Sequence, residues 1–344
     1  MPILNIRRIP INFTSAVIKP PFTRWAPLLA LPLCLASCSE DIRLVAPGNP
    51  VPIVYAIFDV QDLHHHMLLS KSFAGEESLS DLLNRTGILH YDHARIRIAS
   101  MLGGFAGEFT PVDSSGRQPG LFPEHPHRYY KYSGPIKSIK YRISIETGEN
   151  DETLVADLVP LNRFVLLTPH PLTRTFYFYE DPTLFSWTPS PGSGMFQIDF
   201  ILHYRDFLRD GTQHDSSFTH SVVLFPENLE WNSGTCSYRS FSDPFFGHLR
   251  RELTESPGVD YRMPRRFEIG VTCGDTILAR YLKWDRQQVD GQMNPNGNIE
   301  GAIGLIASKY SIRIDNMKLS SRSQDSLVKG RYTKALNFTY NPEW

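Results

Sequence analysis

The sequence is poor in cysteine, and its charges nearly cancel. Only 4 cysteines occur in 344 residues, and none of them belongs to a CxxC pair or to a Cys/His metal spacing. The 35 basic residues are balanced by 36 acidic ones, which gives a formal net charge of −1. This balance excludes a general electrostatic attraction to nucleic acid. We therefore expect no nucleic-acid partner.

Catalytic signatures are missing as well. The sequence contains neither a GxSxG serine-hydrolase motif nor an HExxH zinc motif. The serine of Gly192-Ser193-Gly194 lies in a predicted hairpin turn and is interpreted as a turn former. The acidic residues around Gly211 miss the spacing of an EF-hand calcium loop. We therefore predict no catalytic residues, no metal site and no cofactor, and the protein is expected not to be an enzyme.

One apolar run stands near the N-terminus, after Arg24, and it ends in Leu35-Ala36-Ser37-Cys38. It is too short to span a bilayer but typical of a secretory signal. Its last four residues resemble the bacterial lipobox, in which the cysteine is lipidated and becomes the mature N-terminus. We predict that residues 1–37 are removed and that Cys38 carries the lipid. An ordinary cleavage site with a cysteine nearby by chance is the alternative.

The residues after Cys38 refine the expected location. Ser39-Glu40-Asp41 gives the mature chain a polar, acidic start, which is similar to the surface-export signal of Bacteroidota lipoproteins. Residues 38–50 are interpreted as a lipidated tether. No second apolar run reaches membrane-spanning length, so attachment would rest on the lipid. We predict an outer-membrane protein exposed at the cell surface, with a periplasmic orientation as the alternative.

Two cysteines remain in the expected mature chain, Cys236 and Cys273. A disulfide between them can persist in the cell envelope. However, Cys273 falls on the apolar face of a predicted strand at 267–273, where a free cysteine packs as a small apolar residue. Both interpretations stay open from the sequence.

Composition and alternation predict a mainly β fold. Aromatic residues make up 12% of the chain, and 26 prolines and 23 glycines suit many short strands joined by turns. We predict two β-sandwich domains, at 51–170 and 171–344. In the second, a strand around Trp187 leads through a turn into alternating residues 196–204, a hairpin similar to those of immunoglobulin-like and fibronectin-III-like sandwiches. Phe196, Ile198, Phe200, Leu202 and Tyr204 should share its buried face.

One helix is predicted, near 244–254 in the second domain. Asp243 would cap it, and Phe245, Phe246, Leu249 and Leu253 recur at helical spacing. Further strands are predicted at 277–284, 310–319 and 336–340 because these stretches are rich in apolar and aromatic residues.

Aromatic and histidine residues are candidates for ligand-binding groups. Stacking on sugar rings could involve Tyr129, Tyr130, Tyr132, Trp231 and Trp284. Strand aromatics are more often core residues, so a core role is favoured for them. The histidines at 64, 66, 90, 93, 125 and 127 complete no recognised metal spacing, and solvated loop positions are the preferred interpretation.

Three stretches carry a resemblance to a family of Bacteroidota outer-membrane and surface lipoproteins: 52–58 with 69–73, 245–253 with 265–267, and 297–310. The resemblance implies a role beside outer-membrane nutrient uptake or in cell-surface assemblies, and it supplies no catalytic residues. The expected function is therefore a non-enzymatic binding or assembly role, with an outer-membrane protein such as a TonB-dependent transporter as a partner. A surface glycan-binding or glycan-processing protein is the alternative.

Overall fold

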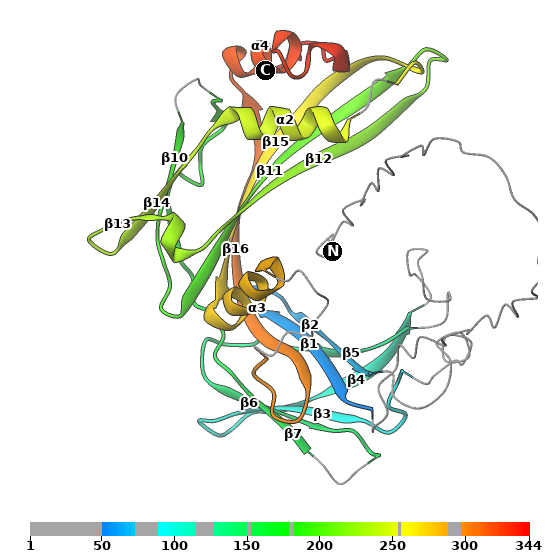
Figure 1. The fold of residues 1–344 in the computed structure, drawn as a ribbon, viewed down its shortest axis with the longest axis vertical. Coiled ribbons are helices and arrows are strands. Elements are labelled where there is room, and N and C mark those ends of the chain that lie inside the picture. Colours follow the sequence, from blue (N-terminus) through cyan, green and yellow to red (C-terminus); the bar gives the residue numbers. More distant parts are fainter. Residues whose placement is uncertain are drawn as a thin grey trace, which may run out of the picture. The chain divides into compact units, whose positions relative to one another are not determined.

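The computed structural model describes residues 50–72, 89–114, 127–149, 153–178, 182–253, 256–287 and 297–344. These residues form mainly strands, arranged in one large sheet and one sheet of four strands (Figure 1). The predicted fold class, mainly β with sandwich-like sheets, is confirmed. Cys38 and the predicted signal, like His125, lie outside the described residues.

The first half of the chain contributes seven strands: β1 (Pro52–Asp59), β2 (His64–Lys71), β3 (Arg95–Ser100), β4 (Ala106–Ser114), β5 (His127–Ser133), β6 (Tyr141–Glu146) and β7 (Thr153–Leu158). They follow one another in the order β1-β2-β5-β4-β3-β6-β7. On β3 apolar and charged residues alternate, and Ile96 and Ile98 are fully buried while Arg95 and Arg97 face water. The two arginines lie 3.3 Å from Glu108 and 3.2 Å from Glu146, respectively.

The second half supplies the remaining strands: β8 (Val165–Thr168), β9 (Thr175–Phe176), β10 (Thr183–Thr188), β11 (Ser193–Leu208), β12 (Gln213–Leu224), β13 (Glu230–Asn232), β14 (Thr235–Ser240), β15 (Val259–Asp275) and β16 (Ile303–Leu319). Four of them extend the large sheet in the order β12-β11-β15-β16, and β16 joins it to β1. The four-stranded sheet has the order β13-β14-β10-β8.

Strand β16 takes part in both halves of the large sheet. Residues 303–309 pair in parallel with β1, and residues 309–317 pair antiparallel with β15. Gly304 has a φ of +112°, and a Cβ atom there would collide with the carbonyl oxygen of Val54, so only glycine permits this close approach. Two domains meeting near residue 170 stay a prediction. In the structure β8, just before that point, pairs with β10, just after it.

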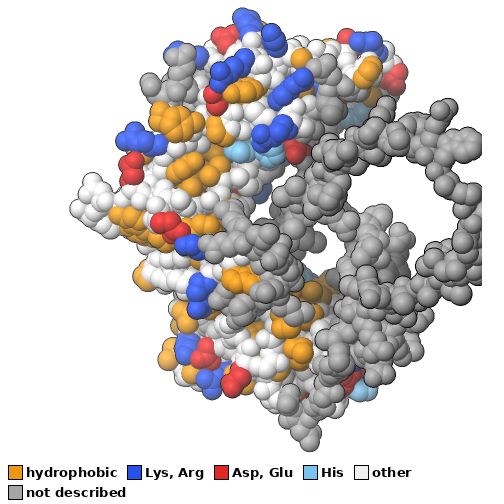
Figure 2. Space-filling view, in the orientation of Figure 1, with side chains coloured by type: hydrophobic (Ala, Val, Ile, Leu, Met, Phe, Trp, Pro, Cys, Tyr) orange, Lys and Arg blue, Asp and Glu red, His pale blue; other side chains and the backbone are white. Residues whose placement is uncertain are grey.

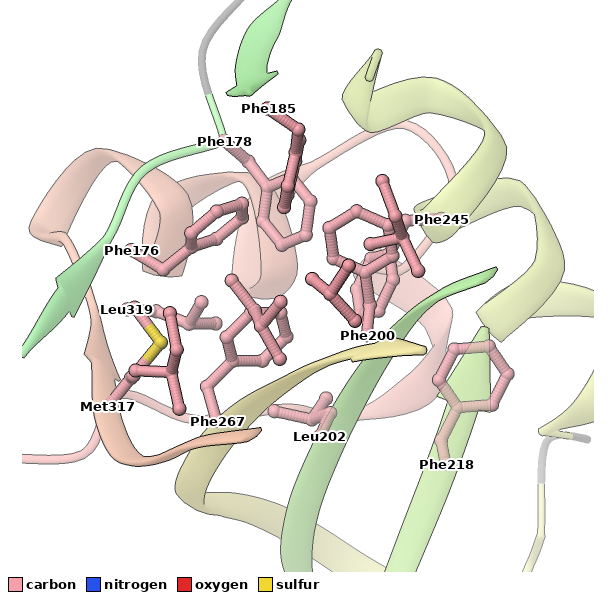
Figure 3. Packing of buried hydrophobic residues seen from close by; sticks show 14 of the residues in the cluster. Phe176, Phe178, Phe185, Phe200, Leu202, Phe218, Phe245, Phe267, Met317 and Leu319 are labelled. Atoms are coloured by element: carbon pink, nitrogen blue, oxygen red, sulfur yellow. The ribbon is translucent and has the colours of Figure 1, made fainter. Parts of the chain in front are cut away.

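The main core lies between the large sheet and the elements that face it (Figure 3). The alternating strand is confirmed as β11: Phe196, Ile198, Phe200, Leu202 and Tyr204 are all buried. Phe200 packs edge-on against Phe185 of β10, with ring centroids 5.6 Å apart. Burial of such a continuous aromatic layer supplies much of the driving force for folding.

Helix α2 (Ser242–Glu252) confirms the predicted helix and buries Phe245, Phe246 and Leu249 against this core. Its N-cap is Phe241, and no side chain caps it, so the prediction that Asp243 caps the helix is wrong. Asp243 instead lies in the first turn and forms an ion pair with Arg331.

The segment 277–284, predicted as a strand, is helical. Helix α3 (Thr276–Gln287) begins after Asp275, whose Oδ1 accepts a hydrogen bond of 2.8 Å from the backbone N–H of Leu278. Leu278 and Ala279 face the sheet residues Met195 and Leu305. The dense apolar and aromatic residues of this segment are compatible with a strand as well as with a helix, which is why a strand was predicted.

The C-terminus also departs from expectation. Helix α4 (Ser321–Lys329), which was not predicted, is capped by Ser320 and buries Leu327. The strand predicted at 336–340 is instead a short 3-10 turn, η2 (Lys334–Leu336), followed by a single bridge between Phe338 and Arg262. Among the described residues, no helix is long and apolar enough to cross a membrane.

Candidate binding site

A groove of about 350 Å³ lies between β16 of the large sheet and β8, the last strand of the four-stranded sheet. Residues of β16 form one wall, and β8 with the residues that flank it forms the other. The groove brings together residues from distant parts of the sequence: Gln61, Arg163, Val165, Tyr310, Ser311 and Arg313.

The β16 wall of this groove is an open strand edge. Pairing with β1 ends at Lys309, and pairing with β9 begins at Lys318. Within the described part of the chain, no strand pairs with residues 310–317 on that side. Near the start of this stretch the backbone N–H of Ser311 donates to Oε1 of Gln61 at 3.2 Å. An unpaired edge is a template for an additional strand.

The opposite wall carries exposed apolar side chains. Strand β8 is the last strand of the four-stranded sheet, and it is bonded to β10 on one side only. Val165 is 50% exposed, Leu167 43%, and Leu172 in the following turn 69%. Natural proteins usually protect an exposed edge strand with charges or cover it, so apolar residues along an edge indicate a contact surface.

Two arginines give the groove its charge. Arg163 is exposed and makes no ion pair with any described residue. Arg313 lies 3.6 Å from Glu268 and 4.0 Å from Asp315, at distances too long for short charge-assisted bonds. A guanidinium without a full set of partners can still bind a carboxylate.

Glu268 anchors a second cluster, on the outer face of the same sheet. Its side chain is 7% exposed and lies 3.0 Å from Nε of Arg266. Nε2 of His203 is 3.2 Å from the same carboxylate oxygen, but the geometry does not make a hydrogen bond. Burying a carboxylate is costly without such partners, so Arg266 stabilises Glu268 in its buried position.

An open pocket of about 390 Å³ adjoins this cluster, lined by His203, Arg205, Asp215, Ser216, Arg265 and Arg266 among others. Asp215 accepts hydrogen bonds of 2.6 and 2.9 Å from Arg205 and also lies within the electrostatic influence of Arg265. Hydrogen bonding from the Arg205 guanidinium lowers the pKa of Asp215 below its usual value. Three arginines, Arg205, Arg265 and Arg266, thus line the pocket with one carboxylate, Asp215, and Arg266 also pairs with Glu268 behind it.

The aromatic residues considered as ligand platforms separate into two groups. Tyr130 and Tyr132 are buried in the core of the first half, which agrees with the favoured core role and does not leave their rings free to stack on a sugar. Tyr129 and Trp284 are half-buried. Trp231 is 53% exposed on β13, and its indole N–H donates to the carbonyl of Pro226. The structure does not bring these five residues into one site.

The histidines weighed as metal ligands form no cluster. Among the described residues, no group of three or more His, Cys, Asp or Glu side chains is arranged to hold a metal ion. His64 bonds to the hydroxyl of Ser133 at 3.1 Å, and the ring of His66 packs edge-on against Tyr129. Both contacts join β2 to β5, so the prediction that these two histidines occupy loop positions is wrong.

The structure brings together a pair of histidines that the sequence did not indicate. His220 of β12 and His248 of α2 face each other, with their Nδ1 atoms 3.0 Å apart. Burial, followed by the nearby charges of His248 and Arg251, lowers the pKa of His220 to about 4. Figure 2 shows histidine side chains beside Lys and Arg side chains gathered over α2. His220 and His248 are 28 residues apart in the sequence, and no local motif links them.

Cys236 and Cys273 are both free and buried in the structure, which therefore contains no disulfide between them. The thiol of Cys273 lies 3.0 Å from the hydroxyl of Ser193. Burial raises the pKa of Cys236 to about 11 and that of Cys273 to about 12. Both thiols are therefore protonated and unreactive at neutral pH.

Comparison with known proteins adds little. No family model matches the chain, and no curated protein matches it. Among solved structures, the crystal structure of the chicken CNTN1 FN1-FN3 domains is 9% identical, with 79% of this chain and 68% of that chain covered. The TM-score is 0.18, so this similarity carries no argument.

Proposed function

We propose that this protein is a lipid-anchored, non-enzymatic binding or assembly component of the outer membrane. The observation that carries the proposal is the unprotected edge strand β8, whose exposed apolar residues Val165 and Leu167 lie beside an open groove. Such an edge is a liability in a free protein, and a partner that covers it removes the liability. The resemblance to Bacteroidota surface lipoproteins favours an outer-membrane protein, such as a TonB-dependent transporter, as that partner.

The anchor has a direct test. Cys38→Ser should leave the fold intact and abolish lipid attachment, because only a thiol can take the diacylglycerol. Incorporation of a fatty-acid probe and fractionation of the cells measure this. If the variant still labels and stays in the membrane fraction, the proposed anchor is wrong.

The binding role is tested by co-purification from native outer membranes. A Val165→Lys/Leu167→Lys variant places two charges on the β8 edge and should lose the partner. Val159→Lys is the matched control, since Val159 is equally apolar and 61% exposed but lies outside the groove. A partner retained by the control and lost by the edge variant supports the proposal. Equal recovery with all three proteins contradicts it.

The basic pocket beside Glu268 favours the second function, binding of a surface glycan. Arg265 and Arg266 would suit a carboxylated or sulfated sugar better than a neutral one, because guanidinium groups pair with such anions. Titration calorimetry with a polyuronate and with a neutral glucan distinguishes the two. Binding of the polyuronate that Arg265→Ala/Arg266→Ala removes would support this function, and no difference between the polymers would exclude it.

A further inference from the structure

We propose that the groove between β8 and β16 binds an extended, acidic peptide segment of the partner, which adds as a strand to the open edge of β16. This inference rests on the proposed binding role and names the chemistry of its partner. It depends on three features of the groove: its backbone edge, its charge and its apolar wall.

The backbone edge defines the conformation of the ligand. Among the described residues, the stretch of β16 without a strand partner on this side covers residues 310–317, and eight residues of strand extend for about 26 Å at about 3.3 Å per residue. Gln61 closes one end by bonding Ser311, and the bond from the N–H of Lys318 to the carbonyl of Arg174 closes the other. A segment entering between these two ends can pair its main chain with β16, as in strand addition to other open sheets.

The charges define one face of the ligand. In a strand, side chains alternate between the two faces of the sheet, so Ser311 and Arg313 share the outer face. Arg163 lines the same groove. No acidic side chain lines the groove itself, and the carboxylates nearest Arg313 are Glu268 at 3.6 Å and Asp315 at 4.0 Å. Acidic residues at alternate positions of an added strand would pair with Arg163 and approach Arg313 more closely than these two carboxylates do.

The apolar wall defines the other face. Tyr310 and Ile312 point toward the main core and are only partly buried there. Leu166 of β8, which belongs to the same core, lines the groove with them. A strand whose other alternate residues are β-branched and apolar would cover this surface. The groove therefore fits a segment that alternates acidic and apolar residues.

The experiment uses fluorescein-labelled peptides of eight residues and the mature protein in detergent. One peptide alternates valine with aspartate, a second alternates valine with lysine, and a third is the Val/Asp peptide with alternate amides N-methylated. We expect the Val/Asp peptide to bind at least tenfold tighter than either of the others, as measured by fluorescence anisotropy. Arg163→Glu should weaken it at least tenfold, whereas Arg209→Glu, an exposed control outside the groove, should not.

Hydrogen exchange with the bound Val/Asp peptide locates the site. Strand addition should slow the exchange of the amides in 310–317, and N-methylation should abolish that protection. Protection confined to the pocket beside Glu268, or equal affinity for the acidic and basic peptides, would overturn the inference. If none of the peptides binds while the membrane partner is still lost in the β8 edge variant, the inference fails and the proposed binding role stands. If that variant also keeps its partner, both fail.

Discussion

Glu268 offers a quantitative test of how the outer face of the sheet is built. Its carboxylate is 7% exposed, whereas its partners Arg266 and Arg313 are 51% and 55% exposed. The cost of burial therefore falls on the carboxylate of Glu268, whereas the two arginines remain hydrated when the carboxylate is removed. Removing a cation should then cost more stability than removing the carboxylate.

The magnitudes follow from this asymmetry. Arg266→Ala leaves a buried carboxylate with Arg313 at 3.6 Å as its remaining strong cation. An incompletely compensated buried charge of this kind should cost about 1–3 kcal/mol, which is less than the full penalty because the site borders solvent. Glu268→Gln keeps the shape of the side chain and removes the buried charge, so its cost should stay below about 1 kcal/mol.

Urea unfolding of both single variants and of the double variant measures the difference. In the Glu268→Gln background, Arg266→Ala should become nearly neutral, because the charge that needed compensation is gone. Strictly additive effects would refute the reasoning. A larger loss for Glu268→Gln than for Arg266→Ala would refute it as well.

Three further predictions concern the core and its titrating groups. Phe200→Ala should cost about 3–5 kcal/mol in urea melts, and Asp199→Ala about 1 kcal/mol because its carboxylate accepts hydrogen bonds; a larger loss for Asp199 would contradict the assigned faces. Mass spectrometry of the unreduced protein should find Cys236 and Cys273 alkylated only in denaturant, and a bridged mass would contradict the free thiols. Because the pKa of His220 is depressed, its neutral ring contributes to the free energy of unfolding above about pH 6.5, and this contribution is lost as the pH falls toward 4. Stability should therefore fall by roughly 1–3 kcal/mol over this range in the wild type and not in His220→Gln. The same pH profile for both proteins would contradict the prediction.

Strong alternation made much of the fold predictable. In β3 and β11 apolar residues occupy every second position, and burial follows that pattern. Helix α2 was found because its apolar residues recur at helical spacing. Helix α3 was missed because its dense apolar and aromatic residues also fit a strand, and only the cap at Asp275 distinguishes the two.

The groove was not predictable because nothing local marks it. Gln61, Arg163 and Arg313 come from three separate regions of the chain, and each alone has the features of an ordinary exposed polar residue. Glu268 was equally hidden, since it occupies a polar position of an alternating strand. Its burial arises from Arg266 beside it and from Arg313 of the neighbouring strand, and only the register of β15 and β16 brings the latter close.

The path of β16 has a consequence for how the chain matures. Strand β1 gains its second neighbour only from residues 303–309, and the bond between Gln61 and Ser311 joins residues 250 positions apart. A chain that emerges N-terminus first thus cannot finish its first half until its last strand has arrived. Such long-range pairing folds slowly. If the proposed export takes place through a membrane, this delay would keep the early residues unfolded while the chain crosses.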